Sequence, residues 1–390
     1  MSAYGVGIIG TGVISDSHAV ALSLLKDRAR LIAAADLNEQ RLRDLTMKHF
    51  VPHTFSDHRA LLARDDIDIV IIATPPNTHE PLVTDALAAG KHVICEKPLA
   101  HTLASADRII AAAKKSDRQV SVVYQVRYGR DARRMIWLRD QGYLGDLIYG
   151  NVRRMAYIAA GAVKSGWWGR WNVAGGGVVM TQFIHELDLM LHLYGDAVEV
   201  KASMDTLKQD IESEDTFVAT VRFGSGAVVT CSATVNAHQL EMPMDVVGTK
   251  ASVHLPWSIR SADRSHQNAV RAQVETAFPS PKAPRKTTVD KVKRKVGQKL
   301  GFKAKVVPRP PESSHTPYFA AFLDALDRGE AVPIGVDEGR RSLELCVAIY
   351  TSALTGATVS MPLDADATYY DGVSAEVYAQ VRSQKPPVAV

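Results

Sequence analysis

The first 124 residues alternate short apolar runs with segments of helical periodicity. The apolar runs, typical of strands buried on both faces, lie at residues 6–9, 31–35, 67–73, 92–95 and 120–123. Apolar positions recur every three to four residues, as in helices, at 14–27, 38–49, 81–89 and 103–115. Strands that alternate with helices at this spacing predict repeated β-α-β units and a parallel, doubly wound sheet.

From about residue 125 the pattern changes to longer strands in which apolar and polar residues alternate. Strands are expected at 147–157, 197–206, 214–222, 226–236 and 242–255, and helices at 128–141, 178–194 and 338–354. This pattern predicts an α+β domain with a large open, mostly antiparallel sheet and a helix on one face. We therefore expect an α/β domain at 1–124, the α+β domain at 125–362 and a C-terminal tail at 363–390.

A segment rich in Pro, Lys and Arg, residues 257–312, interrupts the second domain and is expected to be an insertion or mobile loop, with a short basic helix near 289–300. Residues 282–309 hold eleven Lys or Arg and one acidic residue. Within residues 282–309, Phe302 is the one aromatic residue, so bases would find almost nothing to stack on, and no nucleic-acid partner is expected. A solvated loop and a lid that attracts an anionic substrate are the alternatives.

Composition narrows the class of protein. The chain has 390 residues, of which 46% are hydrophobic and 23% charged, which is enough for two folded cores. It has neither an apolar run of eighteen residues nor a basic leader, so we expect neither a membrane span nor a signal peptide. Three cysteines lie far apart, which predicts no disulfide framework and fits a cytoplasmic protein.

A glycine turn, Gly10-Thr11-Gly12, directly follows the first strand and opens the first helix with Val13 and Ile14. Gly10 permits a tight turn, and Gly12 lets the backbone approach a pyrophosphate at the positive end of the helix dipole. The third small position is Ser15 in place of glycine. The context is that of a Rossmann dinucleotide-binding domain.

An acidic residue, Asp36, stands just after the second strand, where a carboxylate accepts the hydroxyls of an adenine ribose. A surface turn is the alternative interpretation. A carboxylate there repels a 2′-phosphate, so NAD is favoured over NADP. We expect Leu37 and Arg41 to lie beside the same end of the cofactor.

Two further strand ends should point into the same crevice. One carries Thr74, Pro75, Asn77 and His79, and the other carries Glu96-Lys97-Pro98. A charged pair leaving a buried strand is unusual. It is either an ion pair at the surface or a lysine held beside the nicotinamide and the substrate.

A helix after Gly175-Gly176-Gly177 carries a polar stripe on an otherwise apolar surface: Thr181, His185, Asp188 and His192. Polar groups on a buried helix need partners, and a hydroxyl-rich substrate would supply them. His185-Glu186 begins like a zinc-protease motif, but Leu189 replaces the required second histidine, so no metal is expected.

These signatures together resemble the Gfo/Idh/MocA family of nicotinamide-dependent oxidoreductases over about residues 5–362. They are Gly10-x-Gly12 with Asp36, Thr74-Pro75-x-Asn77-x-His79, Glu96-Lys97-Pro98, and Gly175-Gly176-Gly177 with His185-x-x-Asp188. The combination of Glu-Lys-Pro with Gly-Gly-Gly and histidine is far more specific than the glycine turn.

The resemblance implies a role for each matching residue. Lys97 and His185 would be catalytic, His185 as the acid/base that takes a hydroxyl proton and Lys97 as the cation that stabilises the alkoxide. Cofactor contacts would come from Glu96, Thr74, Pro75, Asn77, His79 and Gln125, and substrate contacts from Arg127, Thr181, His185 and Asp188. The chain has Thr181 where many relatives carry Asp or Asn, and Gln125 where Asn is usual.

A tryptophan cluster, Trp167-Trp168-Gly169-Arg170-Trp171, precedes the three glycines. It either packs a loop or subunit contact, or forms a wall on which a sugar ring stacks, with Trp168 and Arg170 touching substrate.

Three functions remain open. The first is an NAD-dependent dehydrogenase of a sugar, glycoside or cyclitol; the second is redox-assisted glycoside cleavage, in which a sugar is transiently oxidised; the third is a dinucleotide sensor without chemistry. Retention of both Lys97 and His185 argues against the sensor. The open sheet should leave one face bare, which predicts a homodimer or homotetramer.

Overall fold

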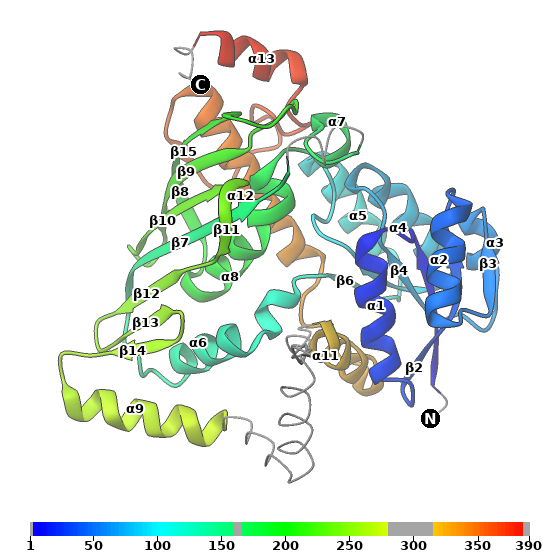
Figure 1. Cartoon of the computed structure of the whole chain (residues 1–390), viewed down its shortest axis with the longest axis horizontal. Helices are drawn as coiled ribbons and strands as arrows, with labels where there is room; N and C mark the ends of the chain where they lie inside the picture. The colour runs from blue at the N-terminus through cyan, green and yellow to red at the C-terminus, as the bar shows by residue number, and fades with distance from the viewer. Residues whose placement is uncertain (1–2, 160–165, 280–314, 385–390) are drawn as a thin grey trace, which may run out of the picture.

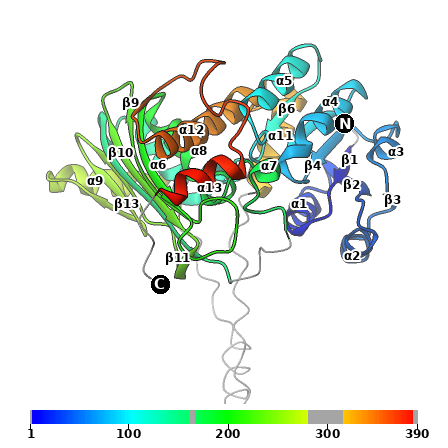
Figure 2. The same cartoon turned by 90° about the horizontal axis from the view of Figure 1, so that it is seen from above.

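Two β-sheets are separated by a layer of helices in the computed structural model, which describes residues 3–159, 166–279 and 315–384 (Figures 1 and 2). The N-terminal sheet lies on one side of this layer and the C-terminal sheet on the other (Figure 2). The helices between them therefore bring residues of both domains together.

The N-terminal sheet has six parallel strands in the order β3-β2-β1-β4-β5-β6. Their bounds are β1 Tyr4–Ile9, β2 Ala29–Ala35, β3 His53–Phe55, β4 Ile69–Ile72, β5 His92–Cys95 and β6 Val120–Val122. The predicted doubly wound parallel sheet is confirmed. The strand order reverses between β1 and β4, and the crevice at their carboxyl ends is where this fold places a ligand.

The helices of the first domain are α1 Val13–Leu24, α2 Glu39–His49, α3 His58–Leu62, α4 His79–Ala88 and α5 Leu103–Lys114. Four of them agree closely with the periodic segments of the sequence, whereas α3 and the short strand β3 were not predicted. The helices cover both faces of the sheet. Every side chain of β4 is therefore buried, and all four are apolar.

The C-terminal sheet is mixed, with strand order β14-β13-β12-β7-β10-β9-β8-β15 and β11 paired to β7. The bounds are β7 Leu147–Tyr157, β8 Ala197–Asp205, β9 Thr216–Phe223, β10 Val228–Thr234, β11 Asn236–Glu241, β12 Met244–Gly248, β13 Ser252–Leu255, β14 Ser258–Arg260 and β15 Val359–Ser360. Neighbours are antiparallel except β7 and β10, which run parallel. The single strand expected at 242–255 is a hairpin of β12 and β13.

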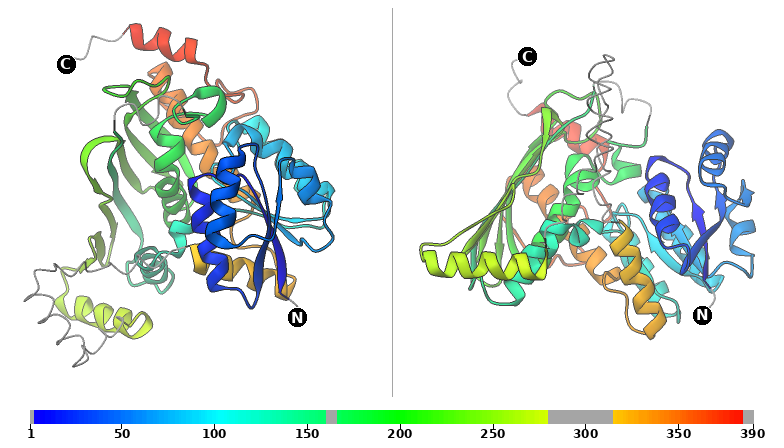
Figure 3. Two further views of the ribbon diagram at one scale, coloured as in Figure 1. Left: turned by 45° about the vertical axis from the view of Figure 1, so that its right-hand side comes forward. Right: turned by 60° about the horizontal axis from the view of Figure 1, so that its bottom comes forward.

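One face of this sheet is covered by α8 (Ile184–Tyr194) and α12 (Val336–Thr355), and the views in Figure 3 show the opposite face open. Along β9, Phe217 and Val221 point inward and are buried, whereas Val218 between them is 54% exposed. The alternation predicted from the sequence thus reflects one packed and one bare face.

The segment 257–312 was expected to be an insertion or mobile loop, and its first part forms regular secondary structure. β14 extends the sheet, and α9 (Arg264–Ala277) follows, with Val270 and Val274 buried on its apolar side. The basic helix expected near 289–300 lies outside the described residues.

Two late segments lie against the first domain and the domain junction. α11 (His315–Arg328) packs on α1, and Arg28 forms 2.7 Å ion pairs with Asp324 and Asp327. In the segment expected as a tail, Tyr378 of α13 (Ala375–Ser383) is buried against Trp171. In the described ranges, no helix is both long and apolar enough to span a bilayer.

Candidate functional site

In the glycine turn at the end of β1, the fold requires a glycine at position 10 but not at position 12. Gly10 has φ +92°, and a Cβ there would lie 2.6 Å from the carbonyl oxygen of Ala73. A Cβ on Gly12 would meet no described atom within 4 Å. Val13, the first residue of α1, is 97% exposed although it is apolar. A ligand that lies against the turn explains both the second glycine and the exposed valine.

Asp36 at the end of β2 is tied to this turn. One carboxylate oxygen accepts from the backbone N–H of Thr11 at 2.6 Å and from its hydroxyl at 2.8 Å, and the other accepts from the N–H of Asn38 at 2.7 Å. Leu37 beside it is 92% exposed, and Arg41 is exposed on α2. The carboxylate is therefore held at the edge of the expected cofactor site.

In the loop after β4, the side chain of Asn77 is free to bind a ligand, whereas that of His79 is already bonded to the protein. Asn77 in the short helix η1 (Pro76–Thr78) is half-buried, and its buried side-chain oxygen has no partner among the described residues. His79 is fully buried, and its ring nitrogens lie 2.9 Å from the carbonyls of Pro98 and Thr74. The expected contact of His79 with the cofactor is thus replaced by a bridge between two loops.

Glu96 has a partner that the sequence did not indicate. Its carboxylate lies 2.9 Å from His18 Nε2 of α1, which is fully buried. Burial raises the pKa of Glu96, but the bond and charge of His18 outweigh this and the net shift is downward. His18, Glu96 and His315 place one ligand-type atom each within 4.8 Å of one another, so this trio could hold a metal ion.

Lys97 reaches from the first domain into the second. Its ammonium donates a 2.5 Å hydrogen bond to the carbonyl of Thr181, in the π-helical turn η3 (Val179–Phe183) that leads into α8. Burial lowers the pKa of Lys97, and the nearby carboxylate of Glu96 opposes this. The hydroxyl of Thr181 donates to the carbonyl of Gly177 at 2.6 Å, so it is already satisfied.

His185 lies one turn after Thr181 and is 8% exposed. Tyr124 meets its ring edge-on at a centroid distance of 6.0 Å, and its Nδ1 has no partner in the described chain. Burial lowers the pKa of His185 well below its usual value, and the charges of Lys97 and Arg154 lower it further. The structure therefore brings Lys97 and His185 to the same end of α8.

Arg154 and Glu186 were not singled out from the sequence, although both lie beside His185. Arg154 extends from β7 and binds Glu186 at 2.7 Å and the amide oxygen of Gln182 at 3.4 Å. Burial raises the pKa of Glu186, and the charge of Arg154 opposes this. Nothing local in the sequence marks this pair, because strand β7 and helix α8 meet only in the folded chain.

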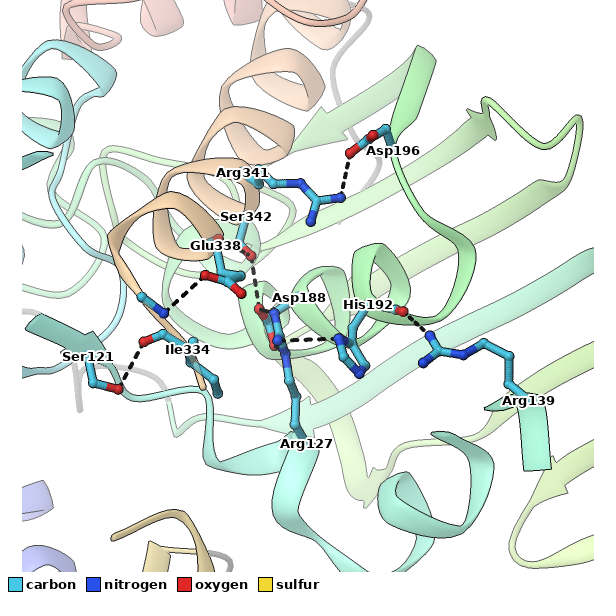
Figure 4. Close-up of polar contacts among 11 residues, drawn as sticks. Ser121, Arg127, Arg139, Asp188, His192, Asp196, Ile334, Glu338, Arg341 and Ser342 are labelled. Carbon is cyan, nitrogen blue, oxygen red and sulfur yellow. Dashed lines mark hydrogen bonds and ion pairs between the residues drawn. The ribbon is translucent and has the colours of Figure 1, made fainter. Parts of the chain in front are cut away.

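Asp188 and Arg127 were expected to touch substrate, but they hold each other instead (Figure 4). Arg127, in η2 (Gln125–Tyr128), donates 2.6 and 2.7 Å bonds to the two oxygens of Asp188, and Ser342 of α12 donates a third at 3.1 Å. Asp188 has no exposed surface. We therefore assign the pair to the junction of η2, α8 and α12, because its hydrogen-bonding capacity is used there.

The residues of the tryptophan cluster differ in their surroundings. Trp171, at the start of α7 (Trp171–Ala174), is buried against Tyr350 and Tyr378 and donates to the carbonyl of Glu212, so it packs the loop. Trp168 is half-buried, and its buried indole nitrogen has no partner among the described residues. Arg170 is exposed.

Comparison with known proteins agrees with this geometry. Residues 4–124 match a family model described as the oxidoreductase family with an NAD-binding Rossmann fold, and residues 130–254 match the GFO/IDH/MocA C-terminal domain. The chain is 28% identical over 256 residues to myo-inositol 2-dehydrogenase of Thermotoga maritima, covering 64% of this chain and 74% of that protein.

Two further relatives differ in what they share with this chain. The WlbA dehydrogenase of Bordetella pertussis, solved in complex with NADH and UDP-GlcNAcA, superposes with a TM-score of 0.76 at 25% identity, covering 93% of this chain and 99% of that one. The α-N-acetylgalactosaminidase of Shewanella oneidensis is 34% identical over 168 residues, which are 40% of this chain and 36% of that enzyme. With both family models matched along more than half of its length, the chain belongs to the Gfo/Idh/MocA family of NAD-binding oxidoreductases.

Proposed function

We propose that this protein is an NAD-dependent dehydrogenase of a secondary alcohol in a sugar, glycoside or cyclitol. His185 takes the hydroxyl proton as general base, and the ammonium of Lys97 stabilises the alkoxide that forms. When bound, the nicotinamide supplies the acceptor for the hydride. The lowered pKa of His185 keeps its imidazole neutral at pH 7, which is the form that accepts a proton.

The observation that carries the proposal is where the fold leaves polar atoms unsatisfied. The buried atoms that have no hydrogen-bond partner in the described chain include one each of Asn77, Gln125, Trp168 and His185. Each such atom costs roughly 1–3 kcal/mol. These four belong to residues expected to touch cofactor or substrate, and a carboxamide and sugar hydroxyls would satisfy them; others, such as those of His101, Arg118 and Gln209, belong to residues with no expected ligand contact.

Charge and the relatives support the ligands that we propose. The carboxylate of Asp36 repels a 2′-phosphate, which favours NAD over NADP. The named activity of the Thermotoga protein and the UDP-GlcNAcA bound by WlbA both point to polyhydroxylated substrates. We expect a sugar, glycoside or cyclitol, with Trp168 and Arg170 beside it.

Redox-assisted glycoside cleavage is a second candidate, favoured by the shared segment with the Shewanella α-N-acetylgalactosaminidase. In that reaction, a transient oxidation acidifies a neighbouring C–H, and the dinucleotide is regenerated within each turnover. The two candidates therefore differ in whether NADH accumulates.

The test is a panel of sugars, glycosides, inositols and sugar acids incubated with NAD. Appearance of NADH absorbance supports the dehydrogenase, whereas release of an aglycone from a nitrophenyl glycoside without NADH supports cleavage. Absence of both products across the panel, with no calorimetric heat from NAD, would contradict the proposal.

We also propose a homodimer or homotetramer, formed through the bare face of the C-terminal sheet. Val218 and Tyr149 are 54% and 40% exposed on that face, and such surfaces commonly mark subunit contacts. Light scattering should give a multiple of the chain mass. Val218→Lys should lower that mass, and a monomeric wild type would refute the idea.

A further inference from the structure

Glu214 is a buried carboxylate that has no part in the chemistry described so far. It precedes β9 and has no exposed surface. One oxygen accepts from the backbone N–H of Gly177 at 2.9 Å; the other accepts from the N–H of Val179 at 2.9 Å and from the hydroxyl of Tyr350 at 3.0 Å. The carboxylate thus binds the start of the segment that carries His185.

The glycines before this segment are needed for that contact. A Cβ on Gly177 would lie 1.9 Å from the backbone carbonyl oxygen of Glu214, and one on Gly176 would lie 1.9 Å from the hydroxyl oxygen of Tyr350. The same carbonyl of Glu214 accepts from the N–H of Val178 at 3.1 Å. Residues 177–179 are therefore bound to Glu214 through three consecutive backbone N–H groups.

A short path leads from Glu214 to the catalytic pair. The carbonyl of Gly177 accepts from the N–H and the hydroxyl of Thr181. The carbonyl of Thr181 in turn accepts from Lys97, and His185 follows one turn later. The segment between is the π-helical turn, a conformation that is rare and often found at functional sites.

We propose that Glu214 is a positioning residue for the dehydrogenase reaction, and that its carboxylate fixes the turn that orients Lys97 and His185 toward each other. The inference rests on the proposed function of those two residues. Glu214 itself touches neither the cofactor nor the substrate.

The charge on Glu214 should be visible in the pH profile. Burial raises the pKa of Glu214 to about 7, against the opposing effect of its hydrogen bonds. The groups that face it, Tyr350 and Cys346 of α12 and Tyr378 of α13, have raised pKa values and stay neutral. The pKa of His185 is well below 6.5, so its protonation falls at lower pH. An acid limb in kcat near pH 7 therefore reports Glu214.

The experiment compares Glu214→Gln with Asp215→Asn in the full chain. Asp215 is an equally buried neighbour whose carboxylate accepts from the N–H groups of residues 207–209, away from α8. With the best substrate of the panel, Glu214→Gln should lower kcat roughly tenfold to a hundredfold and abolish the limb near pH 7, with NAD binding unchanged by calorimetry. Asp215→Asn should keep both kcat and the limb.

A second variant covers the case in which Glu214→Gln does not fold. Tyr350→Phe removes one hydrogen bond that lowers the pKa of Glu214, so the acid limb should move to higher pH. A wild-type kcat and limb in Glu214→Gln, or an unmoved limb in Tyr350→Phe, would overturn the inference while leaving the proposed function intact. Turnover by His185→Ala equal to that of wild type would overturn the proposed function, and this inference with it.

Discussion

His185 and Asp188 lie three residues apart on α8, and the sequence places them on one polar stripe. In the folded protein their side chains differ in their hydrogen-bond partners. Asp188 has no exposed surface and receives three hydrogen bonds from Arg127 and Ser342, whereas the Nδ1 of His185 has no described partner. Polarity on a buried helix therefore predicts that a partner exists, and only the structure tells whether that partner is the protein or a ligand.

Burial also acts on the two side chains with opposite sign. It lowers the pKa of His185 and raises that of Asp188, since in each case the low dielectric disfavours the charged form. At Asp188 the charge of Arg127 opposes the shift. At His185 the nearby charges of Lys97 and Arg154 add to it, which leaves a neutral imidazole.

The largest expected effect is that of His185→Ala. Loss of the proposed general base should lower kcat by roughly 10²- to 10⁴-fold, measured as NADH formation, with NAD binding unchanged by calorimetry. His192→Ala, on the same helix but beside Arg127, is the matched control and should keep far more activity. Equal rates in the two variants would remove His185 from the chemistry.

Breaking the Arg127–Asp188 pair should affect stability more than catalysis. Arg127→Met leaves a fully buried carboxylate unpaired, which should cost about 3–5 kcal/mol in the free energy of unfolding in urea. The exposed Arg153→Met is the control. If Arg127→Met instead raises KM for the substrate at unchanged stability, Arg127 binds substrate and the contrast between Asp188 and His185 fails.

Sequence periodicity predicted the fold well where neighbours in the chain are also neighbours in space. The strands and helices predicted in the first domain, and the helix with His185, depend on local pattern, and all of them appear in the structure; the short β3 and α3 were not predicted. The packing of α11 and α13 against distant elements could not be predicted, because contacts between residues hundreds of positions apart produce no periodic pattern in the sequence. α9 was missed because the prolines and cations after it dominated the segment's composition.

The site divides in the same way. Gly10, Asp36, Lys97 and His185 stand at strand ends or helix positions that local rules identify. Local rules do not identify the residues that support this site. His18 contacts Glu96, which is 78 positions away in the sequence, and Glu214 contacts Gly177, which is 37 positions away. A histidine on the apolar side of α1 was the one available signal for such a contact.

The next largest effect is the pH dependence of stability, to which His185 and Asp188 contribute with opposite sign. The folded pKa of His185 is below the unfolded value, so the unfolded chain binds more protons in that window, and stability falls as pH drops below about 6.5 by at most roughly 1.4 kcal/mol per pH unit. Other histidines whose folded pKa is lowered, such as His79 and His192, contribute slopes of the same sign, so His185→Gln should show a shallower slope than wild type in urea unfolding at pH 7 and pH 5. For Asp188, whose folded pKa is raised, stability instead falls as pH rises between the unfolded and folded pKa values. An identical slope in wild type and His185→Gln would mean that His185 is not buried as a neutral base.

The smallest effect should come from Ser342→Ala, because Arg127 still satisfies both oxygens of Asp188 in its absence. Losing one hydrogen bond should cost about 0.5–1.5 kcal/mol in urea unfolding and leave kcat unchanged. Ser352→Ala removes another buried hydroxyl of α12, which bonds Ala202 and Ala357 far from Asp188. Combined with Asp188→Ala, which removes both acceptor oxygens, the Ser342 variant should show a coupling energy and the Ser352 variant should be additive. Additivity of Ser342→Ala with Asp188→Ala would show that the third hydrogen bond adds nothing to the difference between Asp188 and His185.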